Sequence, residues 1–187
     1  MAQHVCPVWV GYLLASPVRK LFQNPKRILA PYIRSGMTVV DVGCAMGFFT
    51  IPAAGMVGAD GRVIAVDMQP RMIDKLKKRA DKAGVGDRIE TRVCTTDSPG
   101  LSDLEGRVDL ALAFAMVHET PDPARLLREL GQCLKPEGRL LVAEPRGHVT
   151  STMFDETLRW AGDAGLRLVD RPAVSKSHSA VFVKPAA

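Results

Sequence analysis

Five short runs of mainly apolar residues recur along the chain, and each is about as long as a single strand. They cover residues 37–42, 62–67, 88–94, 107–114 and 138–144. Several are apolar almost throughout, which is typical of strands buried on both faces of a parallel sheet. The pattern therefore predicts five strands, several of them buried on both faces.

Segments with helical spacing separate these runs. In residues 123–134 the apolar positions recur at helical intervals: Leu126, Leu127, Leu130, Cys133 and Leu134. Asp122 supplies a capping side chain, and Pro123 suits the first position of the helix. A further helix is predicted from about Ser151 to Ala164, and Gly165 ends it.

Two extended segments, residues 166–171 and 179–184, follow the last helix. Strands that alternate with helices and end in a strand pair are typical of an α/β fold. The fold class predicted is a doubly wound, mostly parallel sheet with helices on both faces and an antiparallel closing element. In such sheets ligands bind beyond the carboxyl ends of the strands, where the strand order reverses.

The chain carries a net charge of +5, which permits an anionic partner such as nucleic acid. Much of the positive charge lies in residues 71–84, whose apolar members share one helical face: Met72, Ile73, Leu76 and Ala80. The basic side chains then form the solvated face of an amphipathic helix. Aromatic residues do not interleave with them, as a base-stacking surface requires. We expect a solvated face here, with a nucleic-acid surface as the alternative.

Composition places the chain among globular proteins that do not cross membranes. Its 187 residues are 47% hydrophobic and 24% charged, and no run approaches the roughly 18 apolar residues of a membrane span. The N-terminal apolar patch has no Lys or Arg before it and is interrupted by Pro7, which argues against a signal peptide. The cysteines Cys6, Cys44, Cys94 and Cys133 form no C-x-x-C pair. This usage predicts a reducing, cytoplasmic location.

The first predicted strand runs into a loop of small residues, VVDVGCAMGFFT at positions 39–50. A dinucleotide fingerprint G-x-G-x-x-G would need glycine at Gly43, Ala45 and Phe48, and two of the three fail. The spacing D-x-G-x-G-x-G fits better, from Asp41 to Gly47, with only Ala45 replacing a glycine. Glycines in such a loop permit tight turns and the close approach of a ligand to the backbone. A purely structural turn is the alternative.

The second predicted strand ends in Asp67, 20 residues after Gly47, a distance that one helix and a returning strand occupy. A carboxylate there can accept hydrogen bonds from both hydroxyl groups of a ribose. Asp67 therefore indicates a nucleoside, without separating NAD from other adenosine cofactors. A surface acid at a strand end is the alternative.

In order and spacing, four motifs resemble those of the class I S-adenosylmethionine-dependent methyltransferases: VVDVGCAMGFFT, VIAVDMQPRMID, VDLALAFAMVHETPDP and LKPEGRLLVAEP. The resemblance covers residues 29 to 185. It implies a Rossmann-like sheet of seven strands with an antiparallel final strand, and S-adenosylmethionine as the cofactor. It also implies one methyltransferase domain over residues 1–187, in which residues 1–28 form an N-terminal cap segment and residues 29–187 the core.

The resemblance also implies which residues bind the cofactor. Four surround its methionine end: Asp41, Gly43, Cys44 and Gly47. Asp67 holds the ribose, Met68 packs on the adenine and Asp97 lies near the adenine amino group. Phe114, at the end of the fourth strand, contacts the cofactor mainly through its backbone.

The acceptor side is expected at the ends of strands four and five, where the sequence places His118, Glu119, Glu144 and His148. Imidazole can act as a base near neutral pH, and a neighbouring carboxylate can orient it. We assign His118, His148 and Glu144 as candidate catalytic residues and assign no metal ligand. The N-terminal segment is expected to bring His4 or Cys6 toward them. A soft metal or metalloid site that includes these two, and plain structural hydrogen bonding, are the alternatives.

These residues favour a methyltransferase that acts on a small-molecule acceptor, with a metalloid or a thiol among the candidates. One alternative is an RNA or protein methyltransferase that uses the basic surface. The other is a non-catalytic module that binds S-adenosylmethionine, or an enzyme that uses a different adenosine cofactor. No N-P-P-Y-like motif follows the fourth strand, which argues against amide or exocyclic amine acceptors.

Overall fold

The computed structural model describes residues 23–186, and the chain divides into two compact units, residues 1–94 and 95–187. The strands are ordered β3-β2-β1-β4-β5-β7-β6 in one seven-stranded sheet. Only β7 runs antiparallel to its neighbours β5 and β6. The predicted doubly wound, mostly parallel sheet with an antiparallel final strand is thereby confirmed. Most of the predicted cap segment, including His4 and Cys6, lies outside the described residues.

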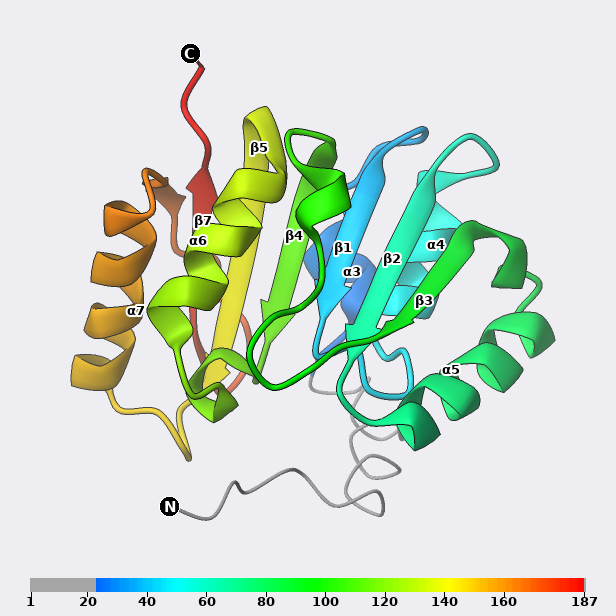
Figure 1. Cartoon of the computed structure of the whole chain (residues 1–187), viewed down its shortest axis with the longest axis horizontal. Coiled ribbons are helices and arrows are strands. Elements are labelled where there is room, and N and C mark those ends of the chain that lie inside the picture. Colours follow the sequence, from blue (N-terminus) through cyan, green and yellow to red (C-terminus); the bar gives the residue numbers. More distant parts are fainter. Residues whose placement is uncertain (1–22, 187) are drawn as a thin grey trace. The chain divides into compact units, whose positions relative to one another are not determined.

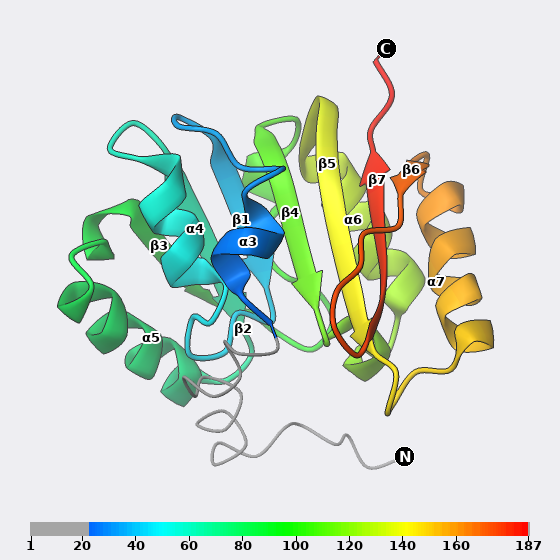
Figure 2. The same ribbon diagram turned by 180° about the vertical axis from the view of Figure 1, so that it is seen from behind.

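The first unit consists of three parallel strands and the helices that cover them. Its elements are α3 (Pro25–Leu29), β1 (Thr38–Val42), α4 (Thr50–Val57), β2 (Arg62–Asp67), α5 (Pro70–Lys82), η1 (Gly86–Arg88) and β3 (Ile89–Val93). Figures 1 and 2 show α3 and α4 on one face of these strands. Helix α5 packs on the same face as α4, because Ile51 of α4 and Ile73 and Leu76 of α5 join one apolar cluster. Helix α5 buries the four predicted apolar positions and exposes Lys77 and Lys78. The predicted amphipathic helix is confirmed.

The second unit holds the remaining four strands. Its elements are η2 (Ser102–Leu104), β4 (Val108–Phe114), η3 (Val117–Glu119), α6 (Pro123–Cys133), β5 (Leu134–Pro145), α7 (Ser151–Asp163), β6 (Arg167–Asp170) and β7 (Ser177–Val183). Helix α6 begins as predicted, because the Asp122 side chain accepts a hydrogen bond from the Arg125 backbone N–H and Pro123 follows the cap. Figure 1 shows α6 and α7 on the same face of these strands.

Strand β5 begins at Leu134, four residues earlier than the apolar pattern predicts. Residues 135–138 have the sequence KPEG, which is typical of a turn, so the apolar pattern does not indicate this start. The backbone nevertheless pairs Leu134 with Val108, and the register shifts before the regular pairing resumes at Leu110. A Cβ atom at Gly138 would lie 2.9 Å from the Val108 carbonyl oxygen, so this crowded bulge needs a residue without a side chain.

Candidate functional site

The loop after β1 has an unusual backbone. Gly43, Ala45 and Gly47 have φ angles of 72°, 46° and 81°, in the left-handed region. The N–H groups of Gly43 and Cys44 donate to the Val66 carbonyl oxygen at 2.9 and 3.1 Å, which ties the loop to β2. The D-x-G-x-G-x-G spacing thus corresponds to three left-handed residues. Ala45 adopts a conformation that costs an L-residue about 1–2 kcal/mol relative to the right-handed one.

Gly47 has a structural reason to lack a side chain. A Cβ atom there would collide with Leu76 Cδ1 of α5 and lie 3.2 Å from Ile51 Cγ1. The sequence suggested that this glycine admits a ligand. The structure shows that the absence of a side chain also serves the packing of the loop against α5.

Asp67 ends β2 and connects it to the loop after β1. Its Oδ2 accepts the Ala45 backbone N–H at 2.9 Å, and its Oδ1 accepts the Gln69 backbone N–H at 2.9 Å. Burial raises the pKa of Asp67, and these two hydrogen bonds oppose the rise. A carboxylate oxygen can accept about two hydrogen bonds, so each oxygen keeps capacity for one ligand hydroxyl.

Asp41 is a buried acid near the end of β1. Its carboxyl group is 3% exposed and accepts a hydrogen bond from the Thr50 hydroxyl at 2.5 Å. Burial raises the pKa of Asp41 to about 7; the Thr50 hydrogen bond opposes this rise and the charge of Asp67 adds to it. The sequence does not indicate Thr50, the first residue of α4, as a partner of Asp41. A hydroxyl residue nine positions after the acid is too weak a signal.

The two other predicted cofactor residues in this unit differ in what they offer. The Cys44 side chain is buried in a cluster with Ala65, Ile73 and Leu76, which leaves only its backbone for a ligand. Met68 directly follows Asp67 and is 38% exposed. It therefore presents an apolar surface beside the carboxylate.

The groups around this loop suit the cofactor that the sequence motifs imply. A carboxylate with spare acceptor capacity fits the two hydroxyl groups of a ribose. The exposed thioether of Met68 fits the apolar face of an adenine, because methionine sulfur contacts aromatic rings favourably. Burial disfavours the charged form of Asp41, and the positive charge of a sulfonium or ammonium group nearby would favour it. The first unit therefore carries groups that fit this cofactor.

For Asp97 and Phe114, in the second unit, the structure by itself gives little support to a role in cofactor binding. Asp97 is exposed in the connection that follows β3. Phe114 is the last residue of β4 and is 9% exposed. The next residue, Ala115, has a φ angle of 54°, so the chain leaves β4 through a strained position.

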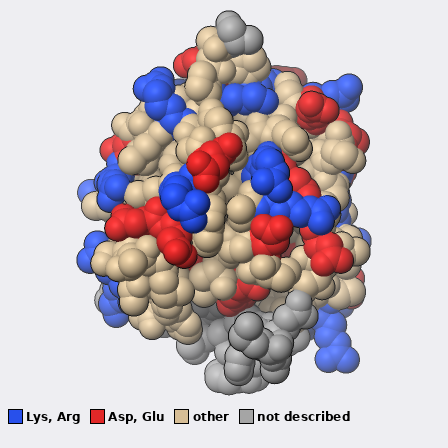
Figure 3. Space-filling model, turned by 60° about the vertical axis from the view of Figure 1, so that its left-hand side comes forward, with Lys and Arg blue, Asp and Glu red and all other residues tan. Residues whose placement is uncertain are grey.

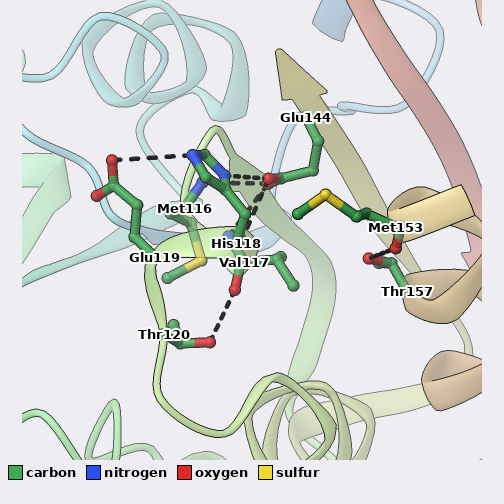
Figure 4. A network of polar contacts seen from close by, with 8 residues as sticks. All are labelled: Met116, Val117, His118, Glu119, Thr120, Glu144, Met153 and Thr157. Carbon is green, nitrogen blue, oxygen red and sulfur yellow. Dashed lines mark hydrogen bonds and ion pairs between the residues drawn. The ribbon is translucent and has the colours of Figure 1, made fainter. Parts of the chain in front are cut away.

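Glu144 organises the loop that follows β4 (Figure 4). It is 1% exposed near the end of β5. Its Oε1 accepts the backbone N–H groups of Met116 and Val117, both at 3.1 Å, and its Oε2 accepts that of His118 at 3.3 Å. Structural hydrogen bonding, one of the alternatives open from the sequence, is therefore present at Glu144. Backbone groups of η3 and of the residue before it occupy most of the carboxylate.

The remaining contact of Glu144 is with the His118 ring, whose Nδ1 meets Glu144 Oε2. A carboxylate only accepts hydrogen bonds, so Nδ1 carries the ring proton and Nε2 keeps the free lone pair. The hydrogen bond that the His118 ring donates to Glu144 raises the pKa of His118; burial opposes this rise, and the charges of Glu144 and Glu119 add to it. Glu119 Oε1 lies 4.0 Å from Nε2.

His148 is exposed, and its ring centroid lies 5.8 Å from that of His118. The structure therefore brings together the three candidate catalytic residues of the second unit. His4 and Cys6, which were expected to join them, lie outside the described residues. Within residues 23–186, no three His, Cys, Asp or Glu side chains form a cluster that could hold a metal ion.

Comparisons with known proteins agree with the motifs. Residues 33–171 match a family model described as a methyltransferase domain. A solved structure, a SAM-dependent methyltransferase from Aquifex aeolicus, is 26% identical and superposes with a TM-score of 0.83, over 96% of this chain and 98% of that one.

Curated relatives differ in their acceptors. Ubiquinone biosynthesis O-methyltransferase of Azorhizobium caulinodans is 34% identical over 159 residues, or 82% of this chain and 59% of that protein. Arsenite methyltransferase of Halobacterium salinarum is 31% identical, over 65% of this chain and 30% of that protein. A tRNA 5-carboxymethoxyuridine methyltransferase of Escherichia coli is 32% identical, over 64% and 44%. The chain spans less than two thirds of the length of each of these relatives.

Proposed function

Because the chain belongs to the class I S-adenosylmethionine-dependent methyltransferases, we propose that it transfers a methyl group from this cofactor to a hydroxyl group of a small molecule. The pairing of His118 with Glu144 is the observation that carries the proposal. A hydroxyl group is a poor nucleophile at neutral pH, and it becomes a good one when a base takes its proton. A relative named as an O-methyltransferase supports the same acceptor class.

The cofactor, when bound, supplies a methyl group already activated on a sulfonium sulfur. Asp67 would hold the ribose hydroxyl groups, Met68 would cover the adenine, and the loop from Gly43 to Gly47 with Asp41 would surround the methionine end. The task left to this chain is to align the acceptor and to remove its proton.

His118 would remove that proton. Its Nε2 carries the free lone pair, because Nδ1 donates to Glu144. Glu144 stabilises the imidazolium that forms, and three backbone N–H groups hold the carboxylate in place. A positioned base of this kind contributes typically 10²–10⁴-fold to the rate. His148, beside His118, would line the acceptor side.

The structure gives less support to the other acceptor classes. On the face that Figure 3 shows, Lys and Arg side chains alternate with Asp and Glu, whereas RNA binding favours a continuous basic surface. The buried thiols of Cys44 and Cys133 have a raised pKa, which disfavours the thiolate that captures a metalloid.

A cytoplasmic location is part of the same proposal. The three described cysteines are free thiols, as a reducing compartment allows. No helix among residues 23–186 has the length and apolarity that a membrane span requires.

The test is a transfer assay with S-adenosylmethionine labelled in its methyl group. The acceptors are a panel of phenols, alcohols and thiols, together with arsenite and unmodified tRNA. We expect labelled methyl ethers from the hydroxyl compounds. Labelled tRNA or methylated arsenic, with no labelled small-molecule ether, would reject the proposal.

A further inference from the structure

A cavity of about 620 Å³ lies in the second unit, beside the first residues of β7. Strand β6 pairs with Val181–Val183 of β7, so the cavity borders the preceding part of β7, Ser177–Ser179. The connection of residues 171–176 forms much of its wall, and Figure 2 shows this connection running along β7 toward the end of β5. The volume falls in the range of small-molecule sites, about 300–1,000 Å³.

The charges around this cavity have one sign. Arg146, Arg171 and Lys176 line it, and none of the described lining residues is acidic. Asp170, the acid that precedes Arg171, accepts the Arg171 backbone N–H with its Oδ1 at 2.7 Å. Arg146, Arg171 and Lys176 are all exposed, and a group of cations at an open cavity with no acidic side chain in the described wall favours an anionic ligand.

Arg146 is held in place by the backbone of the cavity wall. Its Nε donates to the Ser177 carbonyl oxygen at 3.2 Å, and its backbone N–H donates to the Lys176 carbonyl oxygen at 3.0 Å. The Nη end of the guanidinium can then bind a carboxylate or phosphate with little loss of side-chain entropy.

The rest of the wall suits an apolar body attached to that anion. The Phe154 and His178 rings stack at 5.5 Å with an interplanar angle of 24°, and Val174 is buried beside them in the wall. A flat apolar ligand that ends in an acidic group matches both parts of the cavity.

The cavity adjoins the residues proposed for catalysis. Glu144 pairs with His178 across β5 and β7, and Pro145 pairs with Ser177. Arg146 lies in the segment between Glu144 and His148, so one short loop carries a cavity cation and a neighbour of His118. From this juxtaposition we propose that the cavity binds an acidic group, a carboxylate or a phosphate, of the methyl acceptor. The inference rests on the proposed small-molecule function.

Calorimetry with matched probes tests it without any methyl transfer. The probes are 4-hydroxybenzoate, its neutral analogue 4-hydroxybenzamide, and 4-hydroxyphenyl phosphate. We expect at least one of the two acids to bind about 10-fold more tightly than the amide, and the tighter acid identifies the group recognised. The double variant Arg171→Gln/Lys176→Gln should lose most of this preference for the acids, because only Arg146 of the three lining cations remains.

A matched control removes the same charge elsewhere in the second unit, in the variant Arg128→Gln/Arg167→Gln. Both residues are exposed and neither lines the cavity. This variant should keep the preference for the acid. If the two double variants lost the preference for the acid to the same extent, only general charge attraction would be shown, and the inference would be overturned. Equal affinity of the wild type for acids and amide would overturn it as well.

The outcome separates this inference from the proposed function. Methyl transfer to neutral and acidic hydroxyl compounds with the same kcat/KM would overturn the acidic-group inference and leave the function standing. Absence of transfer to every small molecule would reject the function, while calorimetry would still report on the cavity. If the cavity variant lost salt-sensitive binding of a 20-nucleotide RNA and still preferred the acids, the cavity would be an RNA site and the inference would fail.

Discussion

The Asp67 carboxylate accepts the backbone N–H of Ala45 at 2.9 Å and thereby joins the end of β2 to the loop after β1. One side chain thus supports the loop and, in our proposal, the ribose. The substitution Asp67→Ala removes both contributions. We expect S-adenosylhomocysteine to bind with about 1.5–3 kcal/mol less free energy, as for the loss of hydrogen bonds to a charged group.

Calorimetric titration of S-adenosylhomocysteine measures this loss. The control is Asp60→Ala, at an exposed acid before β2, which should bind as the wild type does. Unchanged affinity in Asp67→Ala would remove Asp67 from the cofactor site.

The left-handed conformation of Ala45 predicts a stabilising substitution. Ala45→Gly removes steric strain of about 1–2 kcal/mol and costs about 0.5–1 kcal/mol in chain entropy. Thermal denaturation should show a net gain of up to about 1 kcal/mol. The control Ala83→Gly changes an exposed residue whose φ angle is −86°, so it should lower stability. A destabilised Ala45→Gly protein would show that this alanine carries no strain.

The buried carboxyl group of Asp41 makes stability depend on pH. Its pKa is about 7 in the folded chain, against an ordinary value of 3.8, so the folded state holds an extra proton between these pH values. The contribution of Asp41 to the free energy of unfolding is therefore largest below about pH 4, falls as the pH rises and levels off above about pH 7. In Asp41→Asn we expect the free energy of unfolding to change by about 2–4 kcal/mol less over this pH range. This follows because each pKa unit corresponds to about 1.4 kcal/mol.

Urea denaturation of the ligand-free protein at pH 5, 6, 7 and 8 measures this curve. Asparagine still accepts the Thr50 hydroxyl, which keeps the comparison close. If the wild type and Asp41→Asn show parallel curves, Asp41 titrates as an ordinary acid.

The link between Glu144 and His118 predicts a shift that proton NMR can follow. Glu144→Gln removes the charge that raises the pKa of His118, so this pKa should fall toward 6.5. Backbone N–H groups of residues 116–118 should exchange faster, because a neutral amide accepts more weakly. The control Glu156→Gln, at an exposed position of α7, should change neither. An unshifted His118 in Glu144→Gln would mean that the pair is not coupled.

The sequence predicts those features that depend on local spacing. The apolar positions of α5 recur at helical intervals, and the structure buries all four. Asp122 caps α6 because a capping side chain acts on residues three positions away. Asp41 and Asp67 are found at strand ends because each follows a continuous apolar run.

The sequence does not reveal partners that only the fold brings together. Thr50 reaches Asp41 through the placement of α4, a helix whose apolar residues do not form a single stripe. Glu144 binds backbone N–H groups, which every residue type except proline carries, so no side-chain pattern indicates its task. The sequence indicates Gly47 as a ligand contact. It does not indicate that a side chain at this position would collide with Leu76, which lies 29 positions away in the sequence.

The central claim is that His118 takes the proton of a hydroxyl acceptor. The most direct measurement is kcat for methyl transfer as a function of pH, in the wild type and in His118→Gln, with S-adenosylhomocysteine affinity as the control. We predict a wild-type rate that rises with pH through the raised pKa of His118 and then levels off. In His118→Gln we predict a rate about 100-fold lower, with that titration lost and the cofactor affinity unchanged. A His118→Gln protein that keeps the wild-type kcat and pH profile would contradict the claim.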